Sequence, residues 1–258
     1  MSVNALTMLT YFYLSPHLDD AVLSCGGVIH HQTQAGERVV VVTVCAGDPP
    51  PGPLSDCALE HHQRWETPGD AVAARRAEDL AALKVLGAEA IHLAFPDCLY
   101  RTDPASGQHL YPTREALFGD VHPAEAALAQ DIAGDIAGVL RGAQPHRLYV
   151  PLGLGNHVDH QVARRAAELA GDVFAYFEDY PYAAQEPGSA AMALGRALTP
   201  EVVPLMEADL AARVAAIAAH ASQISTFWGG LAEMEAAVRQ FAERTGGGVL
   251  AERLWRAG

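Results

Sequence analysis

Apolar residues occur along this chain in short continuous runs, separated by longer segments in which they recur three and four positions apart. The run at residues 39–44 is continuously β-branched, which is typical of a strand buried on both faces of a sheet. Length and spacing predict strands at 8–14, 38–46, 91–95, 147–152 and 173–177, and helices at 21–34, 71–86, 124–141 and 161–170. Strands and helices alternate, so we expect an α/β fold with a parallel sheet.

No repeat, low-complexity block or shift in composition divides the 258 residues, so we expect a single domain over residues 1–258. Residues 47–69 are rich in proline and contain a histidine cluster at 60–65. A loop of this length in a compact domain is usually functional or mobile, so we predict a lid or rim over the functional site; an ordered surface insertion is the alternative. Residues 200–258 are expected to add C-terminal helices at 206–222 and 231–243.

The composition restricts the class of partner. The formal net charge is −14 and Lys84 is the only lysine, which argues against a nucleic-acid or anionic-membrane surface. The chain starts without a basic signal region, and no apolar run approaches about 18 residues, so we expect a cytoplasmic protein that does not enter a membrane. The cysteines lack paired spacing and are expected to be free thiols. A small neutral or cationic substrate fits this acidic net charge. The sequence is compatible with a homo-oligomer as well as with a monomer.

The segment Pro16-His17-Leu18-Asp19-Asp20 lies in the turn between the first predicted strand and the first helix. Open α/β sheets bind ligands at this end of a strand, beside a helix N-terminus. His17 and Asp20 are three positions apart and point the same way in a first helical turn, whereas Asp19 is free to handle a proton. A divalent metal would compensate this cluster of charge. The alternative is an aspartate helix cap beside a hydrogen-bonded histidine.

A second cluster, His157-Val158-Asp159-His160, follows the strand at 147–152 after a glycine-rich turn. Turns at the ends of two strands of one parallel sheet can face each other, so His17 and Asp20 can converge with one or both of these histidines. Two histidines, a carboxylate and an open position for water form a catalytic zinc set, although other divalent ions bind such ligands too. The spacing does not decide which of the two later histidines is a ligand.

These groups support a metal-assisted hydrolysis of an acyl bond, most simply an amide. Asp19 is placed to deprotonate a metal-bound water. The histidine that is not a ligand can stabilise the oxyanion or protonate the leaving amine, and Asp159 can hold its tautomer. Two further residues are candidates with a simpler structural explanation. Asp97 could orient a substrate or merely cap a turn, and Arg75 could merely form a solvated helix pair with Glu78.

The sequence resembles the LmbE-like, or PIG-L, family of zinc-dependent N-acetylglucosaminyl deacetylases. The segments that carry the resemblance are Pro16-His17-Leu18-Asp19-Asp20 with Gly26-Gly27, Arg75-Arg76-Ala77-Glu78-Asp79 through Phe95-Pro96-Asp97, His157-Val158-Asp159-His160 and, more weakly, His220-Ala221-Ser222-Gln223. The first is similar to the family's P-H-x-D-D and the third to its H-x-D-H. Arg213 stands where the family often has lysine, and Leu18 where many members have proline.

The resemblance implies a Rossmann-like, mostly parallel sheet flanked by helices. It implies a hydrolase that removes the N-acetyl group from an N-acetylglucosamine-type conjugate, which would be its small-molecule partner. It further implies Zn2+ as the cofactor, with the three ligands His17, Asp20 and His160.

The resemblance also implies the remaining roles. Asp19 would be the general base, His157 the acid or oxyanion donor, and Asp159 the residue that orients His157. Arg75 and Asp97 match positions that meet the sugar.

Two other functions compete with the deacetylase. One is a non-catalytic protein that keeps the pocket for a sugar or a metal. The other is a nucleotide-binding Rossmann protein, which requires a Gly-x-Gly-x-x-Gly turn after the first strand. Here Ser24-Cys25-Gly26-Gly27 lies inside the predicted helix instead. Residues 47–69 and 100–122 match no acceptor-binding pattern, and substrate choice would be made there.

Overall fold

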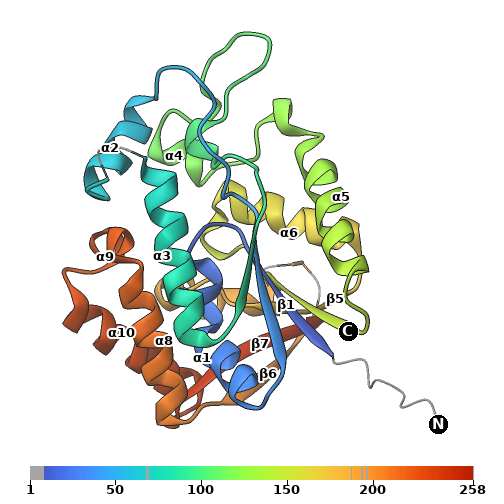
Figure 1. Ribbon diagram of the computed structural model, residues 1–258, viewed down its shortest axis with the longest axis vertical. Helices are drawn as coiled ribbons and strands as arrows, with labels where there is room; N and C mark the ends of the chain where they lie inside the picture. Colours follow the sequence, from blue (N-terminus) through green and yellow to red (C-terminus); the bar gives the residue numbers. More distant parts are fainter. Residues whose placement is uncertain (1–8, 68–69, 187, 193, 196, 258) are drawn as a thin grey trace.

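The computed structural model describes residues 9–67, 70–186, 188–192, 194–195 and 197–257. A seven-stranded sheet of order β3-β2-β1-β4-β5-β7-β6 forms its centre, with helices on both faces (Figure 1). The strands are β1 Thr10–Ser15, β2 Arg38–Thr43, β3 Glu89–His92, β4 His146–Pro151, β5 Val173–Phe177, β6 Leu198–Pro204 and β7 Ala251–Ala257. The expected α/β fold and single domain are confirmed.

Ten α-helices connect the strands within the described ranges. They are α1 Asp20–Gln34, α2 Asp56–Arg64, α3 Ala71–Leu86, α4 Arg114–Leu117, α5 Leu128–Arg141, α6 Val158–Ala170, α7 Tyr182–Gln185, α8 Glu207–Ala219, α9 Ala221–Phe227 and α10 Leu231–Thr245. Helices α1, α3 and α8 pack together on one side of the sheet, and α5 and α6 pair on the other (Figure 1). None of the helices in the described part of the chain is long and apolar enough to cross a membrane.

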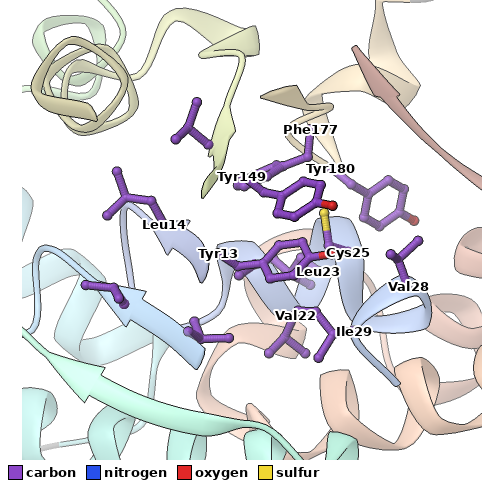
Figure 2. Packing of buried hydrophobic residues seen from close by; sticks show 14 of the residues in the cluster. Tyr13, Leu14, Val22, Leu23, Cys25, Val28, Ile29, Tyr149, Phe177 and Tyr180 are labelled. Atoms are coloured by element: carbon purple, nitrogen blue, oxygen red, sulfur yellow. The ribbon is translucent and has the colours of Figure 1, made fainter. Parts of the chain in front are cut away.

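Strands β1 to β5 run parallel to one another, so their carboxyl ends lie at one edge of the sheet. β1 is buried along its whole length, and Tyr13 of β1 stacks on Tyr149 of β4 with ring centroids 4.6 Å apart. Leu23 and Ile29 of α1 pack against this layer, as Figure 2 shows. A packed centre of this kind holds the turn after β1, which carries the first motif, on a rigid support.

The last two strands of the sheet order are antiparallel: β7 lies between β5 and β6. Residues 200–258 contain the expected helices, but also two strands that the sequence did not predict, β6 and β7, which flank α8, α9 and α10. β6 contains Pro200 and Pro204, which are tolerated because it is an edge strand. β7 carries a buried Glu252, whose charge masks the apolar pattern of a strand.

Gly26 and Gly27 of the first motif allow α8 and β7 to approach α1 closely. A Cβ atom on Gly27 would lie 2.7 Å from Oε1 of Glu252, and one on Gly26 would lie 2.9 Å from Cγ of Arg213. Glu252 accepts the N–H groups of Gly27 and Val28, at 2.9 Å each. Helix α1 is therefore tied to the C-terminal part of the sheet. All four cysteines are buried free thiols, as expected.

Candidate active site

The turns that follow β1, β4 and β5 line one cavity of about 600 Å³. It collects most of the residues that the sequence marked as candidates: His17, Asp19, Asp20, Arg75, Asp97, His157 and His160. Asp159 is the exception, because its side chain is buried behind them and only 1 % of the residue is exposed. The two motifs therefore meet, although 142 residues separate His17 from Asp159.

The first motif brings His17 and Asp20 together in a different way from the one expected. Helix α1 begins at Asp20, so His17 lies in the turn before the helix. The His17 backbone N–H donates to Asp20 Oδ2 at 2.8 Å, and His17 Nδ1 lies 3.1 Å from the same oxygen. Ser15 braces the turn, since its hydroxyl donates to the His17 carbonyl and accepts from the Ala21 N–H. Asp20 Oδ2 is also 3.3 Å from Nε2 of His160.

The far nitrogen of each of these histidines meets a buried carboxylate. His17 Nε2 lies 2.9 Å from Asp159 Oδ2, and His160 Nδ1 lies 2.7 Å from Asp179 Oδ1. Asp179 itself accepts two backbone N–H groups of the turn after β4, at 2.7 and 2.9 Å. Carboxylates in this position fix the tautomer and orientation of a histidine and raise the basicity of the nitrogen that faces a metal.

The structure corrects one expected pairing, that of the Asp159 carboxylate with His157. The carboxylate goes to His17, and the backbone N–H of Asp159 donates to His157 Nδ1 at 3.3 Å. The reason is local: His157 is the N-cap residue of α6, so its ring turns back onto the helix. Burial, together with the charges of His17 and His160, lowers the pKa of His157 to about 3. The ring is therefore neutral, and because Nδ1 accepts, its proton is on Nε2.

Asp19 occupies the N-cap position of α1, but its side chain makes no capping hydrogen bond. Its carboxylate lines the cavity, with Oδ1 3.5 Å from Nη2 of Arg75. Burial and the adjacent charge of Asp20 raise the pKa of Asp19 to about 6, against the opposing effect of Arg75. The alternative of a simple aspartate cap is thus excluded for Asp19, whose raised pKa suits it to take up and release a proton.

Arg75 does not form the solvated helix pair that was the alternative. Its guanidinium lies 4.6 Å from the ring centre of Trp65, the residue is 7 % exposed, and its Nε makes no hydrogen bond within the described residues. Nη1 of Arg75 is 4.0 Å from Asp97 Oδ2. Glu78, the expected partner, instead accepts the N–H and the hydroxyl of Ser222. The motif at residues 75–79 is therefore in direct contact with the motif at residues 220–223.

Asp97 caps a turn, which was one of its two alternatives, and it also lines the cavity. Its Oδ1 accepts the Leu99 N–H at 2.9 Å and so caps the short helical turn Cys98–Tyr100. Its Oδ2 lies 3.7 Å from His17 Nε2 and faces Arg75. One oxygen fixes the carboxylate, and the other is directed toward the cavity.

The donor set of this cavity fits a divalent metal. Ring nitrogens of His17, His157 and His160 lie within 4.8 Å of one another, and Asp20 Oδ2 lies 3.1 Å from His17 Nδ1 and 3.3 Å from His160 Nε2. Burial alone would lower the pKa of His160, but Asp20 and Asp179 raise it to about 10. Without a metal, a proton on His160 balances these carboxylates, and a divalent cation bound at the same place would supply that positive charge instead. Imidazole and carboxylate ligands suit zinc among other divalent ions.

Parts of the cavity wall come from residues 47–69 and 100–122, for which the sequence predicted no helix or strand. The segment expected as a lid or rim contains α2, which contributes Cys57, Glu60, His61 and Arg64. Arg114, Leu117 and Phe118 of the second irregular segment also line the cavity. Four aromatic side chains also line the cavity, those of Tyr180, Tyr182, Phe227 and Trp228.

Sequence reasoning missed two residues of the site. Asp179 follows β5 just as the aspartates of the first motif follow β1, and a carboxylate at the end of a parallel strand is a signal that could have identified it. Arg101, which contacts Asp159, carries no such signal, because its partners become neighbours only in the folded chain.

Comparisons with known proteins agree with this geometry. Residues 12–170 match the PIG-L family, described as GlcNAc-PI de-N-acetylase. Over 191 residues the chain is 29 % identical to 2'-N-acetylparomamine deacetylase of Niallia circulans, an alignment that covers 67 % of each protein.

Two solved structures extend the likeness to nearly the whole chain. The zinc-inhibited form of teicoplanin deacetylase Orf2 superposes with a TM-score of 0.85 at 30 % identity, covering 95 % of this chain and 97 % of that one. The A40926 pseudoaglycone deacetylase Dbv21 gives a TM-score of 0.78 at 30 % identity, covering 95 % of each chain. The family match includes both histidine and aspartate motifs of the cavity, and the chain belongs to the PIG-L family.

Proposed function

We propose that this protein is a zinc-dependent hydrolase that removes the acetyl group from an N-acetylglucosamine-type conjugate. The observation that carries the proposal is the convergence of His17, Asp20 and His160 beside Asp19, a carboxylate that no helix cap uses. The deacetylase relatives favour N-deacetylation of a small amino-sugar conjugate over other hydrolyses.

His17, Asp20 and His160 would hold the metal, since Asp20 Oδ2 already lies near one ring nitrogen of each histidine. Two histidines and one carboxylate leave a position open for water and substrate. Zinc bound there would supply Lewis-acid chemistry, polarising the acyl oxygen and lowering the pKa of water. Asp159 and Asp179 orient the two histidines from behind.

Asp19 acts as the general base. Its pKa of about 6 leaves it ionised at neutral pH, and it takes a proton from the attacking water. Arg75, 3.5 Å away, holds the carboxylate in the cavity. After the attack, Asp19 carries the proton that the leaving amine needs and returns it to that nitrogen.

His157 serves as the oxyanion donor rather than as the acid. It is neutral because its pKa is about 3, and its Nε2–H donates to the acyl oxygen as negative charge develops. Arg75 and Asp97, which lie 4.0 Å apart in the cavity lining, would hydrogen-bond to hydroxyl groups of the sugar.

The test combines metal content with turnover. Untagged wild-type protein should contain about one zinc per chain and release acetate from a panel of N-acetylglucosamine glycosides, whereas Asp20→Ala should lose both. Asp19→Asn should keep the metal and lose roughly 10²–10⁴ in kcat, the usual contribution of a general base. Asp131→Asn, at an exposed position of α5, is the matched control. Unchanged turnover in Asp19→Asn would remove Asp19 from the mechanism, and wild type that takes up no metal would refute the hydrolase.

A further inference from the structure

Three potential ligand sets overlap at the base of the cavity. They are His17 with His157 and His160, His17 with Cys45 and Asp159, and Cys98 with His157 and Asp159. The ligand atoms within each set lie within 4.8 Å of one another. Two of the sets contain a thiol, and both of those also contain Asp159.

A thiol beside an open metal site is a hazard for a hydrolase. Thiolate binds zinc strongly, and a metal deprotonates a coordinating thiol, whose proton is released to solvent. Capture of the ion by Cys45 or Cys98 would add a protein ligand and close the position that water needs. Burial raises the pKa of both thiols, so without a metal they are protonated.

Asp159 is the residue that either thiol set requires, and both of its oxygens already accept hydrogen bonds. Oδ2 accepts from His17 Nε2 at 2.9 Å and from the Cys98 backbone N–H at 3.0 Å. Oδ1 accepts from Nη1 of Arg101. With the carboxylate side chain 0 % exposed, no water replaces these partners.

Hydrogen bonds also fix the side chain of Arg101, and we call the group of Arg101, Glu125 and Tyr111 the clamp. Its Nε and Nη2 donate to the two oxygens of Glu125, the second at 3.1 Å, and its Nη1 also reaches the Pro96 carbonyl at 3.2 Å. The Tyr111 hydroxyl donates to Glu125 at 2.6 Å. A bidentate guanidinium–carboxylate pair of this kind fixes the direction of the arginine. Arg101 therefore holds the Asp159 carboxylate in one orientation.

The other supporting carboxylate shows that such a clamp is not a general requirement. Among the described residues, Asp179 holds His160 and is itself held by the backbone N–H groups of Gly153 and Leu154. No ligand set within the described residues combines Asp179 with a cysteine. The charged clamp is found on the side of the site where the thiols lie.

We propose that Arg101 is a positioning residue that keeps Asp159 on His17 and thereby prevents Cys45 and Cys98 from entering the metal coordination. The inference rests on the proposed metal-dependent function of this cavity. Arg101 acts through Asp159 and does not itself touch the substrate.

Cobalt(II) tests the inference, because a bound thiolate gives a sulfur-to-cobalt charge-transfer absorption that imidazole and carboxylate ligands do not give. Wild-type protein loaded with cobalt should lack this band, and Arg101→Gln should gain it. The band should disappear again when Cys45→Ser and Cys98→Ser are added to Arg101→Gln. Arg253→Gln, which breaks another bidentate arginine–glutamate pair, with Glu178, is the matched control and should show no band.

The outcomes separate this inference from the proposed function. A wild type that binds neither cobalt nor zinc refutes the metal site, and this inference with it. A thiolate band in wild type, or a folded Arg101→Gln that binds cobalt without the band, refutes the role of Arg101 alone. If Arg101→Gln does not fold, Glu125→Gln carries the same test, because it keeps the arginine and loosens its clamp.

Discussion

Gly155 offers a sharp test of how the turn after β4 supports the site. It lies two residues before His157 and has φ +78°, in the region that favours glycine. A Cβ atom at this position would lie 2.5 Å from Cγ, 2.6 Å from Cδ1 and 3.0 Å from Cβ of Tyr182. These atoms are the base of the ring, so the ring cannot avoid the methyl group by a small rotation. The Tyr182 ring in turn contacts the ring of His160, with centroids 5.8 Å apart.

Gly155→Ala should therefore cost more than backbone strain. Left-handed strain costs about 1–2 kcal/mol, and forcing a methyl group into a packed site costs typically about 1–3 kcal/mol more. Gly36→Ala is the matched control, because Gly36 has φ +85° and nothing within 4 Å of an added Cβ. It should lose only the strain energy, roughly 2–4 °C in Tm per kcal/mol for a chain of this size.

The assay is thermal unfolding together with kcat for acetate release. Gly36→Ala should keep wild-type kcat, whereas Gly155→Ala should lose both stability and kcat, since the displaced turn carries His157. A double-mutant cycle with Tyr182→Ala isolates the ring contact, because Gly155→Ala should then cost less, with only the Tyr182 Cβ atom left at 3.0 Å from the added methyl group. Additive effects in the cycle, within about 0.5 kcal/mol, would refute the argument from the Tyr182 contact.

Two further predictions concern residues behind the cavity. Asp179→Asn should weaken zinc affinity by about 10–100-fold, measured by chelator competition, because the residue orients His160; unchanged affinity would contradict that role. Burial lowers the pKa of His220 to about 4, against an unfolded value of about 6.5. The folded protein therefore loses stability as pH falls from about 6.5 to 4, by up to about 3 kcal/mol from this residue. His220→Gln should lose less stability over that range in denaturant titrations; equal losses would contradict the assignment.

The parts of the site that the sequence predicted are formed by residues that are neighbours in the chain. The apolar strand, the polar turn and the helix after it lie within residues 8–34, so the position of the first motif at the carboxyl end of β1 follows from neighbouring residues. The same holds for the turn between β4 and α6. The convergence of the two motifs follows from the parallel sheet, which brings strand ends to one edge.

Side-chain contacts between residues far apart in the chain could not be predicted from the sequence. The Asp159 carboxylate meets His17, 142 residues away, because His157 turns back to cap α6. Arg101 belongs to the site only because the segment after β3 passes behind Asp159, where the Cys98 N–H also donates. β7 was missed for a similar reason: its Glu252 is buried against the N–H groups of Gly27 and Val28, a compensation that no local pattern reveals.

The clamp behind Asp159 has a consequence for changing the substrate range by directed evolution. Residues 100–122 supply part of the cavity wall, so a library for new acyl or aglycone groups would naturally diversify them. The same segment also carries Arg101 and Tyr111, and single-base changes can remove either one. Asp179, by contrast, is supported by backbone amides, which most substitutions leave in place. Libraries that fix Arg101 and Tyr111 while varying their neighbours should therefore retain more metal-competent clones than fully random ones.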